Sequence, residues 1–218
     1  MAEMERRAAL HGALADAGRV AVVDLLTLGD ASPSELAATL HMPSNLLAHH
    51  VNVLVARGLV ERVRSEGDRR RTYLRLVPAN LDGSAHPVPR PSRVLFVCTA
   101  NSARSHLAAA LWRRASRVPV ASAGTHPADA IDPGAVAAAS RHQLPLRLVA
   151  PRHVDDVRTV QDLVITVCDR AHEEIGLHAD AHWSVPDPTR VGSDEAFDGA
   201  VADLDRRIRN FAPRLLAA

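Results

Sequence analysis

The sequence contains no lysine, only two cysteines and few aromatic residues. Two cysteines in 218 residues are too few for a disulfide scaffold or a cluster of thiolate ligands around a metal. The chain has no run of about 20 apolar residues, so no membrane-spanning helix is expected. Its first seven residues lack the apolar block of a signal peptide. These absences predict a cytoplasmic protein that does not associate with a membrane.

The remaining composition is that of a globular protein with two small domains. Hydrophobic residues make up 47% of the chain, enough to form a core. The net charge of +1 predicts no general attraction to nucleic acid, so such binding needs a local basic surface. Residues 80–92 carry three prolines and no helical or strand periodicity. We interpret them as a linker between a domain of residues 1–79 and a domain of residues 93–218.

The N-terminal domain shows the pattern of a helix, a tight turn and a second helix. Ser32 is expected to cap the first helix, with Pro33 in its first turn and Glu35 in a capping box. The second helix is expected to begin at Ser44 and to end at Gly58. Its apolar residues fall on one face at helical spacing.

The opposite face of this second helix carries short side chains that fit the major groove of DNA. The candidate DNA-contacting residues on it are Ser44, Asn45, Ala48, His49 and Asn52. The neighbouring His49 and His50 cannot both face one ligand from a helix. We therefore expect one of them at the surface and the other partly buried, rather than a metal pair.

A basic hairpin is expected to follow, because residues 59–64 and 71–76 alternate as strands do. Seven arginines and three acidic residues lie in and beside it, an excess of four positive charges. A basic hairpin next to a recognition helix is suited to binding phosphates. Arg69, Arg70 and Arg71 are the leading candidates for these contacts.

This domain resembles the winged helix-turn-helix of ArsR-type regulators over about 60 residues. The runs that carry the resemblance are Arg19-Val-Ala-Val-Val-Asp-Leu-Leu, Ala48-His-His-Val51, Gly58-Leu-Val60 and Thr72-Tyr-Leu-Arg-Leu76. The resemblance implies binding of a duplex DNA operator as a homodimer. The alternative is a domain that packs on the other domain or binds a protein.

Two features depart from the ArsR-type pattern. Residues 32–40 contain none of the arsenic-sensing cysteines of that family. The proline-rich linker also replaces the dimerising helix that follows the hairpin. Residues 3–16, with Leu10 and Leu14 on one face, are the remaining candidate for a helix between subunits.

In the C-terminal domain, the run Cys98-Thr-Ala-Asn-Ser-Ala-Arg104-Ser105 lies between an apolar strand and a helix expected over 103–117. A loop that closes onto a helix N-terminus turns its backbone N–H groups inward, and these groups and the helix dipole bind a tetrahedral anion. The same field lowers the pKa of a cysteine thiol from about 8.5 to about 3.5–7.5. Arg104 is placed to bind two oxygens of the anion, and the Ser105 hydroxyl lies within reach of the Cys98 sulfur. Asn101 tolerates the left-handed backbone that such a loop requires.

Further strands are expected over 118–121, 163–167 and 181–185, alternating with helices near 132–142, 170–175 and 194–215. This alternation predicts an α/β domain with a four-stranded parallel sheet. Cys98, Cys168 and Asp187 each follow a strand, so they should meet at one edge of that sheet. Asp187 is placed to act as a general acid.

Four runs resemble the low-molecular-weight protein tyrosine phosphatases and, among them, the phosphatase-like arsenate reductases. They are residues 94–105, Ser122-Ala-Gly-Thr125, residues 162–169 and the stretch from His182-Trp183 through Asp187-Pro188. The resemblance covers essentially all of 93–218 and implies that Cys98 is the nucleophile, Ser105 its support and Asp187 the acid. It also implies an oxyanion cradle formed by the Arg104 guanidinium and the amides of Thr99, Ala100, Asn101, Ser102, Ala103 and Arg104.

Two features favour arsenate over an aryl phosphate as the substrate. Thr189 and Arg190 stand where tyrosine-specific members usually carry aromatic residues. Cys168 matches the position of a resolving thiol that would attack the Cys98 adduct, although an inert buried cysteine is the alternative. A phosphatase that forms a Cys98 phosphoenzyme, or a repressor that senses an oxyanion or redox change without turnover, also fits the sequence.

The reductant is not specified by the sequence. Residues 169–175 contain no third cysteine and residue 103 is alanine, so no further thiol can carry the oxidation outward. Either a Cys98–Cys168 disulfide is reduced directly, or an external thiol of the mycothiol or thioredoxin type completes the reaction. We expect no bound cofactor.

No metal site is expected. His178 and His182 are four residues apart, but His182 falls in the expected fourth strand. His106, directly after the loop, is expected to be a surface residue of its helix.

Overall fold

The computed structural model describes residues 2–77, 91–175 and 179–215. Most of the predicted linker and His178 lie outside these residues. Among these, residues 2–65 and 69–77 belong to one compact unit, and residues 66–68, 91–175 and 179–215 belong to the other. No helix within the described ranges is long and apolar enough to cross a membrane.

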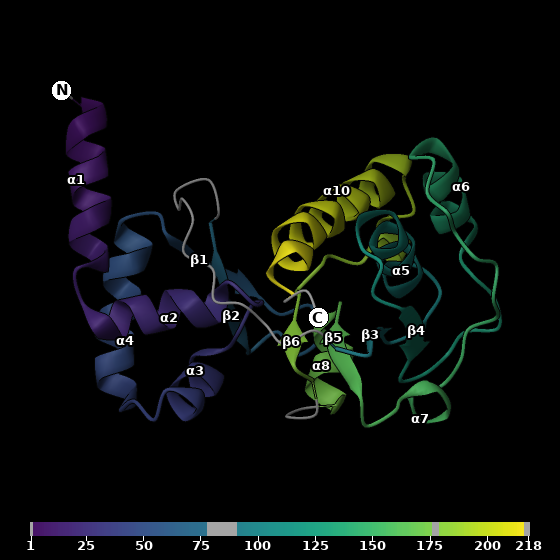
Figure 1. Cartoon of the computed structure of the whole chain (residues 1–218), viewed down its shortest axis with the longest axis horizontal. Helices are drawn as coiled ribbons and strands as arrows, with labels where there is room; N and C mark the ends of the chain where they lie inside the picture. Colours follow the sequence, from purple (N-terminus) through teal and green to yellow (C-terminus); the bar gives the residue numbers. More distant parts are fainter. Residues whose placement is uncertain (1, 78–90, 176–178, 216–218) are drawn as a thin grey trace. The chain divides into compact units, whose positions relative to one another are not determined.

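The N-terminal unit consists of four helices followed by an antiparallel hairpin (Figure 1). The elements are α1 (Ala2–Leu14), α2 (Ala17–Leu26), α3 (Pro33–Thr39), α4 (Ser44–Ala56), β1 (Val60–Arg64) and β2 (Thr72–Leu76). Buried side chains from all of these elements form one apolar core, which contains Leu36, Leu54 and Leu74. The predicted helix-turn-helix and hairpin are confirmed.

Local signals set the ends of the two central helices. The Ser32 hydroxyl accepts from the Glu35 amide and the Glu35 carboxylate accepts from the Ser32 amide, so the predicted capping box is present. Gly58 follows α4 with a φ of 69°, a left-handed conformation that favours glycine.

Helix α1 packs on its own domain. Leu10 and Leu14, the apolar face predicted to meet a second subunit, lie against the core of this unit, and Ala13 is buried. Part of the apolar surface of the helix predicted over residues 3–16 is therefore buried within its own domain.

The C-terminal unit is built on a parallel sheet with the strand order β4-β3-β5-β6, so the predicted four-stranded parallel sheet is confirmed. The strands are β3 (Arg93–Cys98), β4 (Val120–Gly124), β5 (Asp162–Thr166) and β6 (Ala181–His182). The helices are α5 (Arg104–Ala115), α6 (Pro133–Arg141), α7 (Val154–Val157), α8 (Asp169–Ile175), α9 (Pro188–Val191) and α10 (Asp194–Phe211), with a 3₁₀ turn at Ala212–Arg214.

The fourth strand is shorter than predicted. Only Ala181 and His182 pair with β5, whereas the sequence predicted a strand over 181–185. Beyond them the chain leaves the sheet edge, and the Val185 carbonyl accepts a hydrogen bond from the Arg104 side chain instead.

Helices α5 and α10 cover one face of the sheet and α8 lies on the other (Figure 1). Between the sheet and the first pair of helices, Phe96, Trp112, Trp183 and Phe211 form a cluster with ring centroids 5.6–6.4 Å apart. The chain has few aromatic residues, and most of them lie in this cluster, in the core of the C-terminal domain.

Candidate functional site

The loop that joins β3 to α5 accepts backbone hydrogen bonds at its carbonyl groups from the segment after β4. Four backbone N–H groups of that segment donate to four carbonyls of the loop. The pairs are Thr125 to Cys98, His126 to Thr99, Ala128 to Ala100 and Asp132 to Ser102, with N···O distances of 2.8–3.1 Å. Gly124 permits this approach, since a Cβ there would lie 2.5 Å from the Thr99 carbonyl oxygen. With its carbonyls held on the outside, the loop has its amides available for an anion.

Asn101 ties the loop together. It has a left-handed φ of 48°, as the sequence predicted for this position, and its side chain is buried. Its backbone N–H donates to Cys98 Sγ at 3.2 Å and its Nδ2 donates to Ser105 Oγ at 2.8 Å. Its Oδ1 accepts from the Arg152 amide at 3.0 Å, which anchors the loop to the segment before α7.

The Cys98 sulfur lies among hydrogen-bond donors. Besides the Asn101 amide, the Ser105 hydroxyl lies 3.1 Å from Cys98 Sγ. These two contacts hold the sulfur in place beside the loop.

Arg104, the first residue of α5, is buried and lies between two groups from the segment after β6. Its guanidinium donates to the Val185 carbonyl at 3.0 Å and pairs with Asp187 Oδ2 at 2.8 Å. Burial opposes the charge, but electrostatic interactions with Cys168, Cys98 and Asp187 outweigh it and raise the pKa of Arg104 above its usual value. Arg104 is therefore a permanent cation at the mouth of the loop.

Asp187 is held at both carboxylate oxygens. Oδ2 pairs with Arg104, and Oδ1 accepts from the amide and hydroxyl of Thr189, so Asp187 is the N-cap of α9. The structure thus brings together Cys98, Arg104, Ser105 and Asp187, residues separated by up to 89 positions in the sequence.

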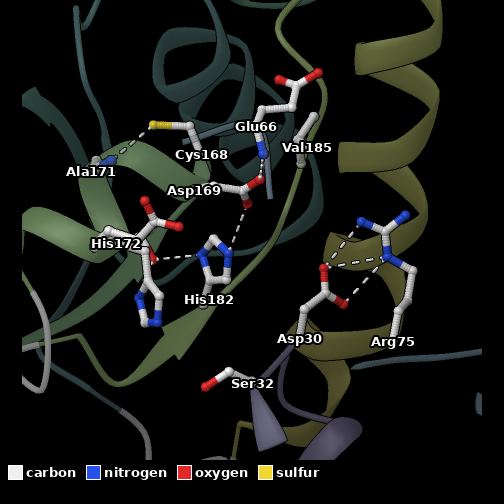
Figure 2. A network of polar contacts seen from close by, with 12 residues as sticks. Asp30, Ser32, Glu66, Arg75, Cys168, Asp169, Ala171, His172, His182 and Val185 are labelled. Carbon is white, nitrogen blue, oxygen red and sulfur yellow. Dashed lines mark hydrogen bonds and ion pairs between the residues drawn. The ribbon is translucent and has the colours of Figure 1, made fainter. Parts of the chain in front are cut away.

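Cys168 is also at this edge of the sheet, and it is buried. Its Sγ accepts from the Ala171 amide at 3.4 Å (Figure 2). The same sulfur lies 3.4 Å from the hydroxyl of Thr99, the residue after Cys98. Burial, reinforced by the charge of Cys98, raises the pKa of the Cys168 thiol to about 11, despite the opposing effect of Arg104. Cys168 is therefore a protonated thiol at neutral pH.

A buried polar network fixes the helix that begins after Cys168. His182 Nε2 lies 3.1 Å from Asp169 Oδ1 (Figure 2). The Nδ1 atom of the same ring lies 2.9 Å from Thr166 Oγ1. The same hydroxyl lies 3.1 Å from His172 Nδ1, and the two imidazole rings stack with centroids 4.1 Å apart. Sequence reasoning missed this network because its members come from β5, α8 and β6. No three His, Cys, Asp or Glu side chains in the described part of the chain are arranged to hold a metal ion.

The prediction for His106 is wrong. We expected a surface residue, but the His106 side chain is buried, with an exposed fraction of 5%. The reason is that α5 packs against β3, β4, α6 and α10, which buries every residue from Arg104 to Trp112. Burial lowers the pKa of His106 to about 4, so its ring is neutral at physiological pH.

The predicted recognition face of α4 is exposed. All five of its candidate residues are at the surface, and so are the three arginines of the hairpin. His49 is exposed and His50 is buried, in line with the prediction that only one would face outward. Arg62 of β1 is one of the seven arginines counted in and beside the predicted hairpin, although it was not a leading candidate for phosphate contacts. Its guanidinium donates to Asn52 Oδ1 at 2.8 Å, so it borders the predicted recognition face of α4.

Comparison with known proteins assigns both parts of the chain. Residues 93–218, more than half of the sequence, match the low molecular weight phosphotyrosine protein phosphatase family. The protein belongs to this family. Residues 21–71 match the MarR family, which agrees with the predicted helix-turn-helix, although the sequence suggested the ArsR type. The chain therefore joins a helix-turn-helix region to an enzyme domain of the low-molecular-weight phosphatase type.

Solved structures with this fold include phosphatases and arsenate reductases. The tyrosine phosphatase Wzb from Escherichia coli K30, in complex with sulphate, is 24% identical, with 56% of this chain and 97% of that chain covered and a TM-score of 0.51. Vibrio vulnificus Wzb with benzylphosphonate is 20% identical, with coverage of 57% and 99% and a TM-score of 0.52. An arsenate reductase from Archaeoglobus fulgidus is 28% identical, with coverage of 55% and 98% and a TM-score of 0.49. No curated protein matches the sequence.

Proposed function

We propose that the C-terminal domain reduces arsenate to arsenite through a covalent adduct on Cys98. The observation that carries this choice is the burial of every aromatic side chain. Phe96, Phe197, Phe211, Trp112, Trp183 and Tyr73 are each at most 3% exposed. None of them can wall the phenyl ring of a phosphotyrosine, so a small tetrahedral anion is the better fit.

The proposed chemistry uses the four residues at the mouth of the loop. The Cys98 thiolate attacks arsenic, and one arsenate oxygen leaves as water after receiving a proton from Asp187. The loop amides and Arg104 hold the remaining oxygens. A second thiol then attacks the Cys98 sulfur, the electron pair of the S–As bond passes to arsenic, and arsenite leaves. Two thiols become one disulfide as As(V) becomes As(III).

The second thiol is either Cys168 or an external thiol of the mycothiol or thioredoxin type. Cys168 lies beside Thr99, which supports Cys168 as the second thiol. Its high pKa keeps it protonated, which supports an external thiol instead. Phosphatase chemistry on the same Cys98 is the competing function, because a phosphate ester would meet the same amides, arginine and acid.

Turnover decides between these functions. The purified protein is incubated with arsenate and mycothiol, glutathione or a thioredoxin system, and in parallel with an aryl phosphate, and arsenite and the phenol are measured. We expect arsenite and little phenol. Rapid hydrolysis of the aryl phosphate without arsenite would establish a phosphatase, and anion binding without either product would establish a sensor.

Cys98 should react rapidly with iodoacetamide at pH 6, because its sulfur lies among hydrogen-bond donors beside a helix N-terminus. Phosphate, arsenate or sulfate should slow the reaction by occupying the loop. Cys168 in the same sample is the internal control, and it should stay unmodified because its thiol is protonated. Peptide mass spectrometry measures both sites. Alkylation of Cys98 at the rate of a model thiol, without anion protection, would contradict the proposed role of the loop.

We also propose that the N-terminal domain binds a duplex DNA operator as a homodimer, with the exposed face of α4 in the major groove. The exposed arginines of the hairpin and Arg62 beside Asn52 support this proposal. The operator complex would link arsenate chemistry to transcription.

Neutralising Arg69, Arg70 and Arg71 together should weaken binding to all DNA sequences alike. Each lost phosphate contact removes close to one counterion, so the slope of log affinity against log salt should fall by about 3. The exposed Arg117 and Arg147 of the C-terminal domain, neutralised together, serve as the control. Fluorescence anisotropy at several salt concentrations measures the slope. An unchanged slope in the triple variant would remove the hairpin from the DNA interface.

A further inference from the structure

The loop of residues 66–68, which joins β1 to β2, belongs to the compact unit that contains Cys98 and Asp187. Two of its backbone amides donate to carboxylates of α8. The Glu66 amide donates to Asp169 Oδ2 at 2.7 Å (Figure 2). The Asp68 amide donates to Glu173 Oε2 at 2.8 Å. These two hydrogen bonds hold the loop on α8.

The first of these acceptors has a fixed position. Asp169 is 3% exposed, and its other carboxylate oxygen lies 3.1 Å from the buried His182 ring. Gly67 lies close to α8, since a Cβ added there would lie 3.0 Å from the Arg170 backbone nitrogen. The backbone of Glu66 is therefore held between a buried acceptor and a tightly packed neighbour.

The Glu66 side chain holds the segment that carries Asp187. Glu66 Oε2 accepts from the Asp187 amide at 2.9 Å. Pro186 and Pro188 flank Asp187 and have no N–H, so the Asp187 amide is the only backbone donor of this tripeptide. The pairing of β6 with β5 involves only Ala181 and His182, so it does not extend to Asp187.

The remaining contacts of Asp187 are made by its side chain. Its carboxylate pairs with Arg104 and accepts from Thr189. These contacts orient the carboxylate, whereas the hydrogen bond to Glu66 fixes the backbone from which the carboxylate extends. A proton donor must lie within hydrogen-bond reach of the leaving oxygen, and a small displacement slows the reaction.

We propose that Glu66 is a positioning residue that holds the Asp187 backbone, so that the Asp187 carboxyl group stays within reach of the oxyanion in the loop of residues 98–105. The inference rests on the proposed role of Asp187 as the general acid. It applies equally to arsenate and to a phosphate ester. Glu66 and Asp187 are 121 positions apart, and no local pattern in the sequence joins them.

The test compares Glu66→Ala and Glu66→Gln in the full chain, each alone and combined with Asp187→Asn. Glutamine keeps an oxygen that can accept from the Asp187 amide, and alanine does not. Glu66 is exposed, so neither change disturbs the core. A single turnover is followed with arsenate, as the loss of the free Cys98 thiol, and with an aryl phosphate, as the release of the phenol. Unfolding temperatures and the phosphate concentration that protects Cys98 from iodoacetamide are measured in parallel.

We expect Glu66→Ala to slow the single turnover about tenfold, because the loss of one hydrogen bond leaves the acid misplaced. Phosphate should protect Cys98 at nearly the wild-type concentration, because the loop amides are untouched. Glu66→Gln should react at nearly the wild-type rate. In the Asp187→Asn background Glu66→Ala should have no further effect, since Glu66 acts through Asp187.

Three results would overturn the proposal. They are a wild-type rate in Glu66→Ala, an equal loss with and without Asp187→Asn, and a loss that follows the unfolding temperature and is not rescued by glutamine.

Gly67→Ala tests the attachment of the loop to α8. The added methyl group would meet the Arg170 backbone and the Glu173 carboxylate, and Glu173 cannot move away without losing the Asp68 amide. Gly199→Ala in α10 is the matched control, because no atom of the described residues lies within 4 Å of a Cβ added there. We expect a slower single turnover in Gly67→Ala and the wild-type rate in Gly199→Ala. Equal rates in the two variants would contradict the proposed attachment.

Hydrogen exchange of the Asp187 amide provides a measurement that does not need turnover. NMR should show exchange at least about tenfold faster in Glu66→Ala and nearly unchanged in Glu66→Gln, because only alanine removes the acceptor. Unchanged exchange in Glu66→Ala would overturn the proposal. A wild-type protein that turns over neither substrate would refute the proposed function instead, and the exchange rates would still decide whether Glu66 holds Asp187.

Discussion

Replacing Cys98 with serine is expected to abolish arsenate reduction and any hydrolysis of aryl phosphates. In both proposed reactions the Cys98 sulfur attacks first, and a serine hydroxyl is a much weaker nucleophile than a thiolate. We expect a loss of at least about a thousandfold, since removal of a covalent nucleophile leaves only binding and electrostatic contributions. Product formation over a range of enzyme concentrations measures the residual rate.

The control for this variant is its unfolding temperature, which shows whether the protein is still folded. Serine differs from cysteine by one atom and can keep hydrogen bonds to Asn101 and Ser105, so Cys98→Ser should unfold at nearly the wild-type temperature. A folded Cys98→Ser protein that retains a tenth of the wild-type turnover would exclude Cys98 as the nucleophile.

Replacing Cys168 with serine should abolish the release of arsenite when no external thiol is present. In the wild-type protein arsenate should then drive a Cys98–Cys168 disulfide, seen as a mass loss of about 2 Da in the intact protein and the disappearance of both free thiols. The two cysteines are free in the structure. An external thiol that restores full turnover to Cys168→Ser would show that Cys168 is dispensable.

The pH dependence of disulfide formation provides an independent measure. Because the pKa of Cys168 is about 11, only its small thiolate fraction can attack at neutral pH. That fraction rises about tenfold for each pH unit below the pKa, so the rate should increase about a hundredfold between pH 7 and pH 9. A rate that is flat over this range would assign the attack to a different thiol.

Asp187→Asn is the matched variant for the competing phosphatase function. Loss of a general acid should slow hydrolysis of an aryl phosphate by about 10²–10⁴-fold, whereas Cys168→Ser should leave it nearly unchanged. The reverse result, with hydrolysis sensitive to Cys168 and indifferent to Asp187, would contradict both assignments.

The sequence by itself determined the features that short-range patterns encode. The capping box at Ser32 and Glu35 needs only residues three positions apart, and the loop from Cys98 to Ser105 lies between a strand and a helix that are adjacent in the chain. The alternation of strands and helices was enough to predict a parallel sheet, because parallel neighbours require crossover connections. That topology then placed Cys98, Cys168 and Asp187 at one edge.

Only the tertiary structure decided features that depend on which surfaces meet. His106 is buried because α5 has packing partners on several sides, which its own periodicity does not reveal. Burial likewise raises the pKa of Cys168 and removes the aromatic rings from the substrate site. The hydrogen bond from Arg152 to Asn101 joins residues 51 positions apart. Such contacts arise from the shape of the packed chain, and no local pattern of residues specifies them.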